Sequence, residues 1–413
     1  MQTIDKAPRL NQPNQPNEST TGSAARKRSL LLTAMDCVVS VVLVLLVLEL
    51  LFTIAGVGQE EFLKYDPILG CSPMPGKKLT YRSEGFSRSS FNSHGMRDRE
   101  VSKSKTPGTL RVAMLGDSLT EALQVNRDES FSYLFEQKLN SGAEKPKYEV
   151  LNFGVGSYYL PQKYLRLKHL ALDFKPDLVI MEMRTGEMLE LMPKPLSNLI
   201  SARPFFLVDG NDKLIESHAY QLQWNGGKEA SRMRATAWLR EHSALWGVFG
   251  IGMQRLLTKP TAFSEMKLQE QEAAQKKAAE NHAPIDFKFV AIDPYLKRLT
   301  KALILQAKEE CRKQNCPMAI MYFTGMRGLQ NPEEEAFLEK TAKELGIPFL
   351  NMHKPVEQNV HSSKEPLYIS HFAPRGHRMV ADELMSFVKK TYPDLFSDAA
   401  KVSNAKERTK NAL

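Results

Sequence analysis

The chain has 413 residues, of which 42% are hydrophobic and 25% charged, and it carries a formal net charge of +9. This length and composition predict one large globular domain with appendages. The excess charge sits at the ends: residues 1–29 hold five Lys and Arg against two acids, and residues 397–413 hold four against two. The middle is nearly balanced and lacks zinc-finger spacing, so the sequence indicates no nucleic-acid-binding surface.

The first residues predict a membrane anchor. Residues 1–29 are polar, rich in Pro and Asn, and end in a basic triplet at 26–28, which predicts a disordered cytoplasmic tail. Residues 30–58 follow as an apolar run that is long enough for a transmembrane helix, although Asp36 and Glu49 interrupt it.

The basic residues before this run place its N-terminal side in the cytoplasm and the rest of the chain outside it. A cleaved signal peptide that ends near Ala55 or Gly58 is the alternative. Lipid attachment at Cys71 is a weaker alternative, because polar residues separate this cysteine from the apolar run.

From residue 109 onward, short apolar runs alternate with helical patterns, which is typical of a parallel sheet with crossover helices. Strands are expected at residues 109–115, 148–154, 177–183, 317–323 and 348–352, and helices at about 129–141, 160–174, 293–314, 332–345 and 375–390. Five strands with covering helices predict one doubly wound α/β domain over residues 109–396.

Three segments do not follow this alternation. Residues 59–108 are rich in Gly, Pro and Ser, and we expect a membrane-proximal linker that packs on the side of the domain. Residues 185–290 form a long insertion after the third strand. Within it, residues 264–282 are charged and Ala-rich, which favours a solvated helix or a flexible excursion over a partner-binding helix. Residues 397–413 are expected to be a disordered tail.

The four cysteines are too few and too scattered for a disulfide-built scaffold. Cys311 and Cys316 have neither the spacing of a redox CxxC motif nor a neighbouring histidine cluster for zinc. For this pair the sequence allows two alternatives: two buried thiols, or a short-loop disulfide in an oxidising compartment. We expect no metal and no cofactor.

Residues 115–121, LGDSLTE, follow the first strand and carry a candidate nucleophile, Ser118. Ligands of an open parallel sheet bind at the carboxyl ends of its strands, and backbone N–H groups at a helix start can stabilise an oxyanion. A serine that merely caps a helix is the alternative. A serine nucleophile needs a base. Among the nine histidines, His371 is best placed, just before the last helix, whereas His377 is expected to pack in that helix.

The GDSLTE motif after the first strand, the histidine before the last helix and the strand pattern together resemble the SGNH/GDSL superfamily of serine esterases. NSHGMRD (92–98) and ARPFFLVDGNDKL (202–214) are similar to stretches of its membrane-anchored bacterial members. The resemblance covers about residues 65–392. It implies a flavodoxin-like doubly wound fold, a Ser118 nucleophile, and a single-pass inner-membrane protein with its domain in the periplasm or extracytoplasmic space.

The superfamily's other sequence blocks are matched unequally. Its first oxyanion donor corresponds to the N–H of Ser118, and its second, usually a glycine, falls on Ser157, with Gly156 one place earlier. Its third block has an asparagine where this chain has Glu187. A carboxylate there repels an oxyanion unless it is protonated or turned away. Removing one such donor typically slows an enzyme about 10²–10³-fold.

The superfamily also places an aspartate two or three residues before the histidine, where this chain has Ile369 and Tyr368. Glu365 is the candidate substitute. A Ser118–His371 dyad whose ring is held by a backbone carbonyl is the alternative.

The resemblance implies a serine esterase that acts on O-acyl groups, above all O-acetyl groups, of an extracytoplasmic glycan. The sequence does not separate it from a glycan O-acyltransferase. A catalytically degenerate relative that binds glycan or supports envelope assembly is a further alternative, motivated by Glu187 and the missing aspartate. We favour catalysis because Ser118 and His371 are both present. The expected partners are an acylated polysaccharide or small ester, and the lipid bilayer through residues 30–58.

Overall fold

The computed structural model describes residues 18–55, 62–82, 84–141, 148–192, 203–217, 227–249, 292–324 and 331–396. The chain divides into two units, residues 1–55 and 56–413. The described part of the first unit is one helix, and the second unit contains the sheet and its covering helices.

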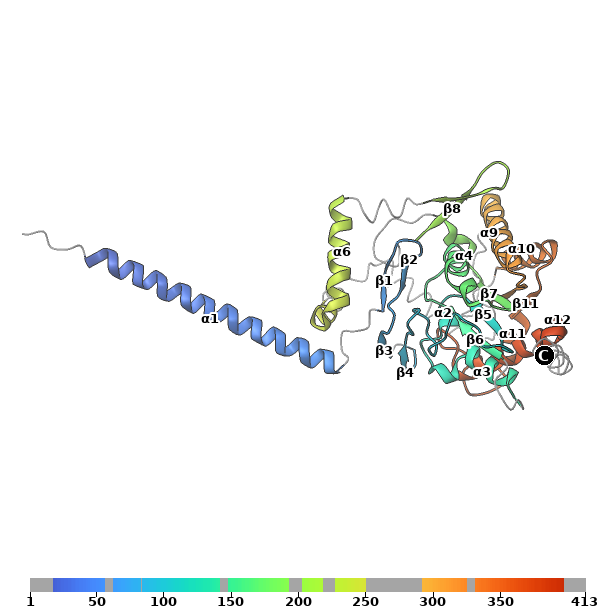
Figure 1. Cartoon of the computed structure of the whole chain (residues 1–413), viewed down its shortest axis with the longest axis horizontal. Helices are drawn as coiled ribbons and strands as arrows, with labels where there is room; N and C mark the ends of the chain where they lie inside the picture. Colours follow the sequence, from blue (N-terminus) through green and yellow to red (C-terminus); the bar gives the residue numbers. More distant parts are fainter. Residues whose placement is uncertain are drawn as a thin grey trace, which may run out of the picture. The chain divides into compact units, whose positions relative to one another are not determined.

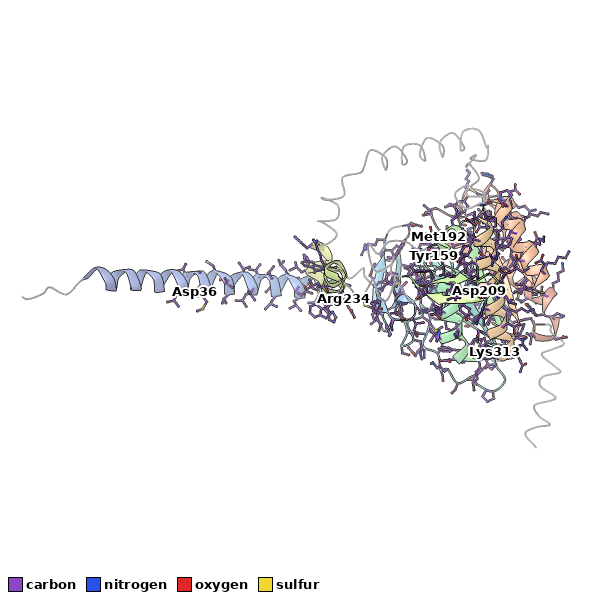
Figure 2. The ribbon with its side chains drawn as sticks, turned by 90° about the horizontal axis from the view of Figure 1, so that it is seen from above. Asp36, Tyr159, Met192, Asp209, Arg234 and Lys313 are labelled. Atoms are coloured by element: carbon purple, nitrogen blue, oxygen red, sulfur yellow. The ribbon has the colours of Figure 1, made fainter. Side chains whose placement is uncertain are left out.

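Helix α1 (Glu18–Ala55) contains the apolar run that we interpreted from the sequence as an anchor (Figure 1). Its segment Leu32–Ala55 is long and apolar enough to cross a membrane, and a signal sequence would share these properties. Figure 2 marks Asp36, one of the two acids in this segment. The helix begins before the predicted residue 30, because the prolines of the leader end at Pro16 and the Ala, Arg and Lys that follow favour a helix.

The second unit is built on a parallel sheet. Its strands are β5 (Leu110–Leu115), β6 (Tyr148–Asn152), β7 (Leu178–Arg184), β10 (Met318–Phe323) and β11 (Phe349–Asn351). They lie in the order β11-β10-β7-β5-β6, so the first strand of the sheet in the chain sits between the second and the third. This is the flavodoxin-like doubly wound order, and it confirms the predicted fold class.

Helices cover both faces of the sheet (Figure 1). One face carries α4 (Leu160–His169), α9 (Pro294–Lys313) and α10 (Pro332–Glu344), and the other carries α3 (Phe131–Leu139), α11 (His353–Val360), α12 (Pro374–Thr391) and α13 (Pro393–Phe396). The side chains of β5 alternate between the two cores: Val112 and Met114 join one, and Ala113 and Leu115 join the other. Strand β5 is therefore buried on both faces, which fixes the position of its carboxyl end.

Residues 62–91 are more than the linker that the sequence predicted. They form two antiparallel hairpins, β1 (Leu63–Asp66) with β2 (Gly70–Pro73) and β3 (Lys78–Tyr81) with β4 (Ser87–Ser90). Leu69 belongs to the same core cluster as side chains of the sheet, so the first hairpin packs on the domain.

The insertion at residues 185–290 is described in part. It contains a 3-10 turn (Met188–Leu191), a hairpin of β8 (Phe205–Val208) and β9 (Leu214–Ser217), and helix α6 (Gly227–His242). The charged stretch 264–282, the expected tail at 397–413 and the first part of the expected tail at 1–29, residues 1–17, lie outside the described residues. The rest of that N-terminal tail, residues 18–29, is helical and not disordered.

The cysteines of the second unit are buried thiols. Cys71 lies within β2 and is 2% exposed, a position that leaves no room for a lipid on its sulfur. Cys311 and Cys316 are free in this structure, and their side chains contact each other.

Candidate active site

The turn after β5 places Ser118 at the carboxyl edge of the sheet. Asp117 caps the one-turn helix α2 (Ser118–Glu121), and its carboxylate accepts a hydrogen bond from the Leu119 N–H at 2.9 Å. The Asp117 N–H donates in turn to Glu182 Oε2 of β7 at 2.7 Å. The central strand thus fixes the turn that carries Ser118, at the edge where open α/β sheets bind their ligands.

The turn after β5 requires a glycine at position 116. A Cβ at this position would lie 2.0 Å from Thr120 Oγ1 and 2.3 Å from Glu182 Oε2. These two buried atoms are hydrogen-bonded to each other at 3.1 Å, so moving either of them would break a buried hydrogen bond. Gly116→Ala is expected to lower the free energy of unfolding by about 3 kcal/mol, measured by denaturant titration.

Gly210 provides the matched control, because nothing lies within 4 Å of a Cβ built there. Gly210→Ala should shift the denaturation midpoint far less. Equal midpoints for the two variants would show that the turn adapts to the extra methyl group.

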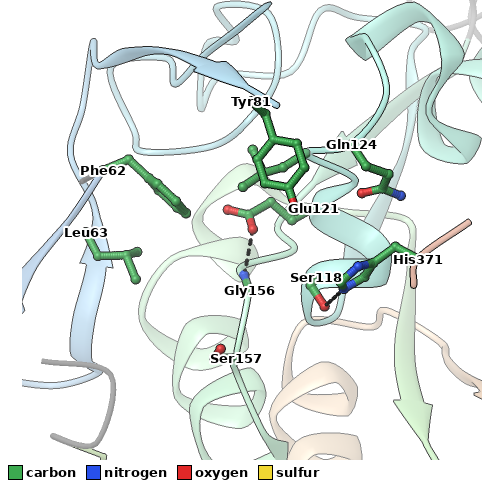
Figure 3. Close-up of a pocket in the computed structure, with 10 residues that line it drawn as sticks. Phe62, Leu63, Tyr81, Ser118, Glu121, Gln124, Gly156, Ser157 and His371 are labelled. Carbon is green, nitrogen blue, oxygen red and sulfur yellow. Dashed lines mark hydrogen bonds between the residues drawn. The ribbon is translucent and has the colours of Figure 1, made fainter. Parts of the chain in front are cut away.

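Three side chains form a continuous hydrogen-bonded chain at the edge of the sheet. Ser118 Oγ lies 2.8 Å from His371 Nε2 (Figure 3). On the far side of the ring, His371 Nδ1 lies 2.7 Å from Glu84 Oε2, which also accepts the His371 backbone N–H at 2.9 Å. A serine, a histidine and a carboxylate in this order make the arrangement of a serine-hydrolase triad.

The carboxylate beside His371 is Glu84, and the expectation of Glu365 is wrong. Glu84 lies in the turn between β3 and β4, 287 residues before the histidine. Glu365 instead pairs with Arg378 at 2.8 Å on the surface. The sequence pattern directs attention to acids just before the histidine, whereas the hairpin supplies one from far upstream. The alternative of a Ser118–His371 dyad required a backbone carbonyl at His371 Nδ1, and Glu84 occupies that position instead.

The charge of Glu84 is set by its neighbour. Partial burial would raise the pKa of Glu84, but hydrogen bonds to His371 and the positive charge that this ring can carry outweigh burial and lower the pKa. Glu84 is therefore ionised at neutral pH. A fixed negative charge at Nδ1 is what stabilises a histidine that takes up a proton at Nε2.

His377 is a packing residue, as the sequence predicted. It is fully buried on the first turn of α12, and its Nδ1 accepts the Phe131 N–H at 3.2 Å. Burial first, and then the charge of Arg97, lower the pKa of His377 to about 3. It stays neutral and lies outside the pocket lining.

The turn after β6 separates the two candidate oxyanion donors. The Gly156 N–H is occupied, because it donates to Glu121 Oε2 at 2.8 Å. Ser157 follows with φ of +66°, a left-handed conformation usual for the glycine that it replaces. Its N–H meets no acceptor in the described part of the chain. Ser157 is thus the better candidate to serve, together with the Ser118 N–H, as an oxyanion donor.

Residues of the NSHGMRD stretch (92–98) form hydrogen bonds to the turn after β5 and to the end of β6. Arg97 is buried, and its guanidinium donates to the Glu121 carbonyl and to Ser89 Oγ, each at 2.9 Å. Asp98 accepts the Asn152 N–H at 3.1 Å. The stretch therefore ties the second hairpin to the helix of Ser118 and to the end of β6.

Glu187 is turned away from the pocket, so its assignment to the oxyanion group is corrected. It is 1% exposed, lies 2.9 Å from Lys163 Nζ and accepts the Arg184 N–H at 3.2 Å. Burial raises the pKa of Glu187, and Lys163 opposes that rise. The Glu187 carboxylate therefore does not repel the oxyanion, as the sequence had led us to expect. Glu187 also does not supply the hydrogen-bond donor that the superfamily's asparagine amide provides.

These groups open into a pocket of about 180 Å³ (Figure 3). Its lining includes Ser118, His371 and Ser157. It also includes Phe62, from the segment before β1, and Tyr81, at the end of β3. The described residues hold no group of three His, Cys, Asp or Glu side chains suited to a metal ion. The pocket is small and partly apolar, with its polar groups gathered around Ser118.

No family model and no curated protein matches this sequence. Solved structures align at low similarity. An esterase, EstA, from Pseudoalteromonas sp. is 11% identical, with 68% of this chain and 97% of that chain covered and a TM-score of 0.35. A GDSL-like lipase from Bacteroides thetaiotaomicron is 13% identical (70% and 92% covered, TM-score 0.32). A catalytic mutant of an acetylxylan esterase from Geobacillus stearothermophilus is 11% identical (69% and 96% covered, TM-score 0.34).

Proposed function

We propose that this chain is a serine-dependent esterase of the SGNH/GDSL superfamily that removes O-acyl groups, above all O-acetyl groups, from an extracytoplasmic glycan. The observation that carries the proposal is the chain of contacts from Glu84 through His371 to Ser118, at the carboxyl edge of a flavodoxin-like sheet. Strand order, GDSLTE motif and contact geometry support the same superfamily independently of the low-similarity alignments.

The geometry supports the following reaction. Ser118 Oγ attacks the acyl carbonyl carbon while His371 Nε2 takes its proton, and Glu84 stabilises the imidazolium. The carbonyl oxygen becomes an oxyanion that the N–H groups of Ser118 and Ser157 stabilise. His371 then gives the proton to the departing sugar oxygen, which leaves an acyl group on Ser118. Water then attacks this ester while His371 takes a proton from it, and His371 returns that proton to Ser118 Oγ as the acyl–oxygen bond breaks and the acid is released.

The size of the pocket favours a small acyl group. Pockets that enclose drug-sized ligands measure about 300–1,000 Å³, well above the roughly 180 Å³ found here. The apolar wall that includes Phe62 and Leu63 suits a methyl group beside the carbonyl carbon. These features support acetyl over long acyl chains.

The first unit supports the proposed location. An apolar segment that can span a membrane, Leu32–Ala55, preceded by Arg26, Lys27 and Arg28, favours a cytoplasmic N-terminus and a domain on the outer side of a bacterial inner membrane. A polymer of the cell envelope is the acylated substrate that such a domain would meet.

A glycan O-acyltransferase is the second candidate, because an acyl group on Ser118 can pass to a sugar hydroxyl as well as to water. The contacts among Ser118, His371 and Glu84 favour either of these activities over a degenerate binding protein.

One assay tests these candidates together. The full-length chain in detergent is given p-nitrophenyl acetate with and without a soluble glycan acceptor, and free acetate and acetylated glycan are both quantified. We expect Ser118-dependent acetate release, and slower turnover of the butyrate and octanoate esters. Acetyl groups found mainly on the glycan would favour the transferase. Absence of both products from a folded chain would reject catalysis.

A further inference from the structure

Glu121 is a buried acid of the pocket that the reaction above does not use. It lies on the same helical turn as Ser118, lines the pocket and is 1% exposed (Figure 3). Its Oε2 accepts the Gly156 N–H, but its Oε1 is buried without a hydrogen-bond partner among the described residues. Buried carboxylates normally have partners for both oxygens, since an unpaired buried charge is costly.

The arginines near Glu121 do not bind its carboxylate. Arg97 directs its guanidinium to backbone carbonyls and to Ser89 Oγ, and Arg166 donates to the Gly95 carbonyl at 3.1 Å. Other titratable groups that interact with Glu121 include Asp117, Tyr158 and Cys71, and none of them carries a positive charge.

This environment favours the neutral acid. Burial raises the pKa of Glu121 to about 7, against the lowering effects of the Gly156 N–H and of the charges on Arg97 and Arg166. A neutral carboxyl group keeps one oxygen as an acceptor for the Gly156 N–H and leaves no unpaired charge at Oε1.

Gly156 connects this carboxyl group to the reaction centre. A Cβ on Gly156 would lie 2.9 Å from Glu121 Oε2 and 3.8 Å from Ser118 Cβ, so the Gly156 backbone lies close to both side chains. The next residue, Ser157, carries the N–H that we assign to the oxyanion. A charge on Glu121 would therefore lie near the point where negative charge develops.

We propose that Glu121 is a positioning residue for the oxyanion-binding turn and that it works as the neutral acid. In its neutral form the carboxyl group accepts the hydrogen bond from the Gly156 N–H, and this bond orients the N–H of the next residue, Ser157. Once ionised, it places a second negative charge beside the forming oxyanion and slows acyl transfer. This inference rests on the proposed esterase activity.

The test is the alkaline side of the pH–rate profile. Glu121→Gln keeps an oxygen for the Gly156 N–H but cannot ionise. For p-nitrophenyl acetate, corrected for Ser118→Ala background, kcat/KM of the unaltered full-length chain should fall about tenfold between pH 6.5 and pH 9. The glutamine variant should show no such fall and should exceed the unaltered chain at pH 9.

Glu334→Gln is the matched control. Glu334 is also buried, has a pKa raised to about 7 by burial and accepts backbone N–H groups, but it does not line the pocket. This variant should keep the alkaline fall. Glu121→Ala also removes the ionisable carboxyl group, so its kcat/KM should likewise not fall between pH 6.5 and pH 9. This second variant keeps the test possible if Glu121→Gln does not fold.

An alkaline fall that persists in the folded Glu121 variants, or an equal loss of activity at every pH, would overturn this inference alone. Absence of Ser118-dependent turnover in the unaltered chain would overturn the esterase proposal and this inference with it.

Discussion

Replacing Glu84 by glutamine is expected to lower kcat for ester hydrolysis about 10³-fold with little change in KM. Glu84 Oε2 lies 2.7 Å from His371 Nδ1 and accepts the backbone N–H of the same residue. A neutral amide cannot stabilise the imidazolium that forms when Ser118 gives up its proton, and its NH₂ group can favour the wrong tautomer of the ring. Steady-state kinetics with p-nitrophenyl acetate at neutral pH measure the effect.

Glu365→Gln is the natural control, because this is the acid that sequence position alone favours. Its carboxylate pairs with Arg378 on the surface, so kcat should stay within about twofold of the unaltered chain. A large loss with Glu365→Gln and none with Glu84→Gln would mean that the hairpin does not supply the triad acid.

Replacing Ser118 by alanine is expected to have the largest effect, a fall in kcat of at least about 10⁴-fold. Without Oγ no acyl group can be held on the protein, and only the oxyanion donors and the pocket remain to assist water. The side chain of Ser118 has one hydrogen bond in the described structure, to His371, so the fold should be retained. The measurement is kcat for acetate release, with circular dichroism to confirm folding.

Ser157→Ala separates a role of the backbone from a role of the side chain. Ser157 is proposed to act through its N–H, and alanine keeps that group, so activity should fall less than about threefold.

If Ser118→Ala kept substantial activity, water would be attacking the substrate directly and the acyl–serine step would be wrong.

Most of the sheet was predictable because strands such as β5 and β10 are buried on both faces, whereas β11 is only partly buried. Segments such as 110–115 and 318–323 read as short continuous apolar runs between helical patterns, and the observed strands lie within a residue or two of the predicted ranges. The hairpins at 63–90 were not predicted. Their strands are four residues long, and one of them, Ser87–Ser90, has no hydrophobic side chain from which a pattern could be recognised.

The site was predictable only where local sequence determines it. Ser118 and His371 stand next to recognisable strand and helix boundaries, and the structure brings them into contact. Glu84 comes from a polar turn, and no spacing rule links it to a histidine 287 residues away. Glu187 was expected near the oxyanion because it stands at the position of the superfamily's asparagine. The buried ammonium of Lys163 holds it elsewhere, and Lys163 lies on a distant helix that no local pattern links to Glu187.

The segment between the anchor and the sheet is thus part of the site. It contributes Glu84, which lies beside His371, and it contributes Phe62 and Tyr81 to the lining of the pocket. Residues 62–91 should therefore be retained in any shortened form of the protein that is meant to hydrolyse esters.

The most direct test of the triad is covalent labelling of the full-length chain with a fluorophosphonate, followed by mass-spectrometric mapping of the adduct. The geometry predicts one adduct, on Ser118, that is absent from Ser118→Ala and forms far more slowly in Glu84→Gln. No adduct on the folded chain, or an adduct that forms equally well in Ser118→Ala, would contradict the assignment of Ser118, His371 and Glu84 as a catalytic triad.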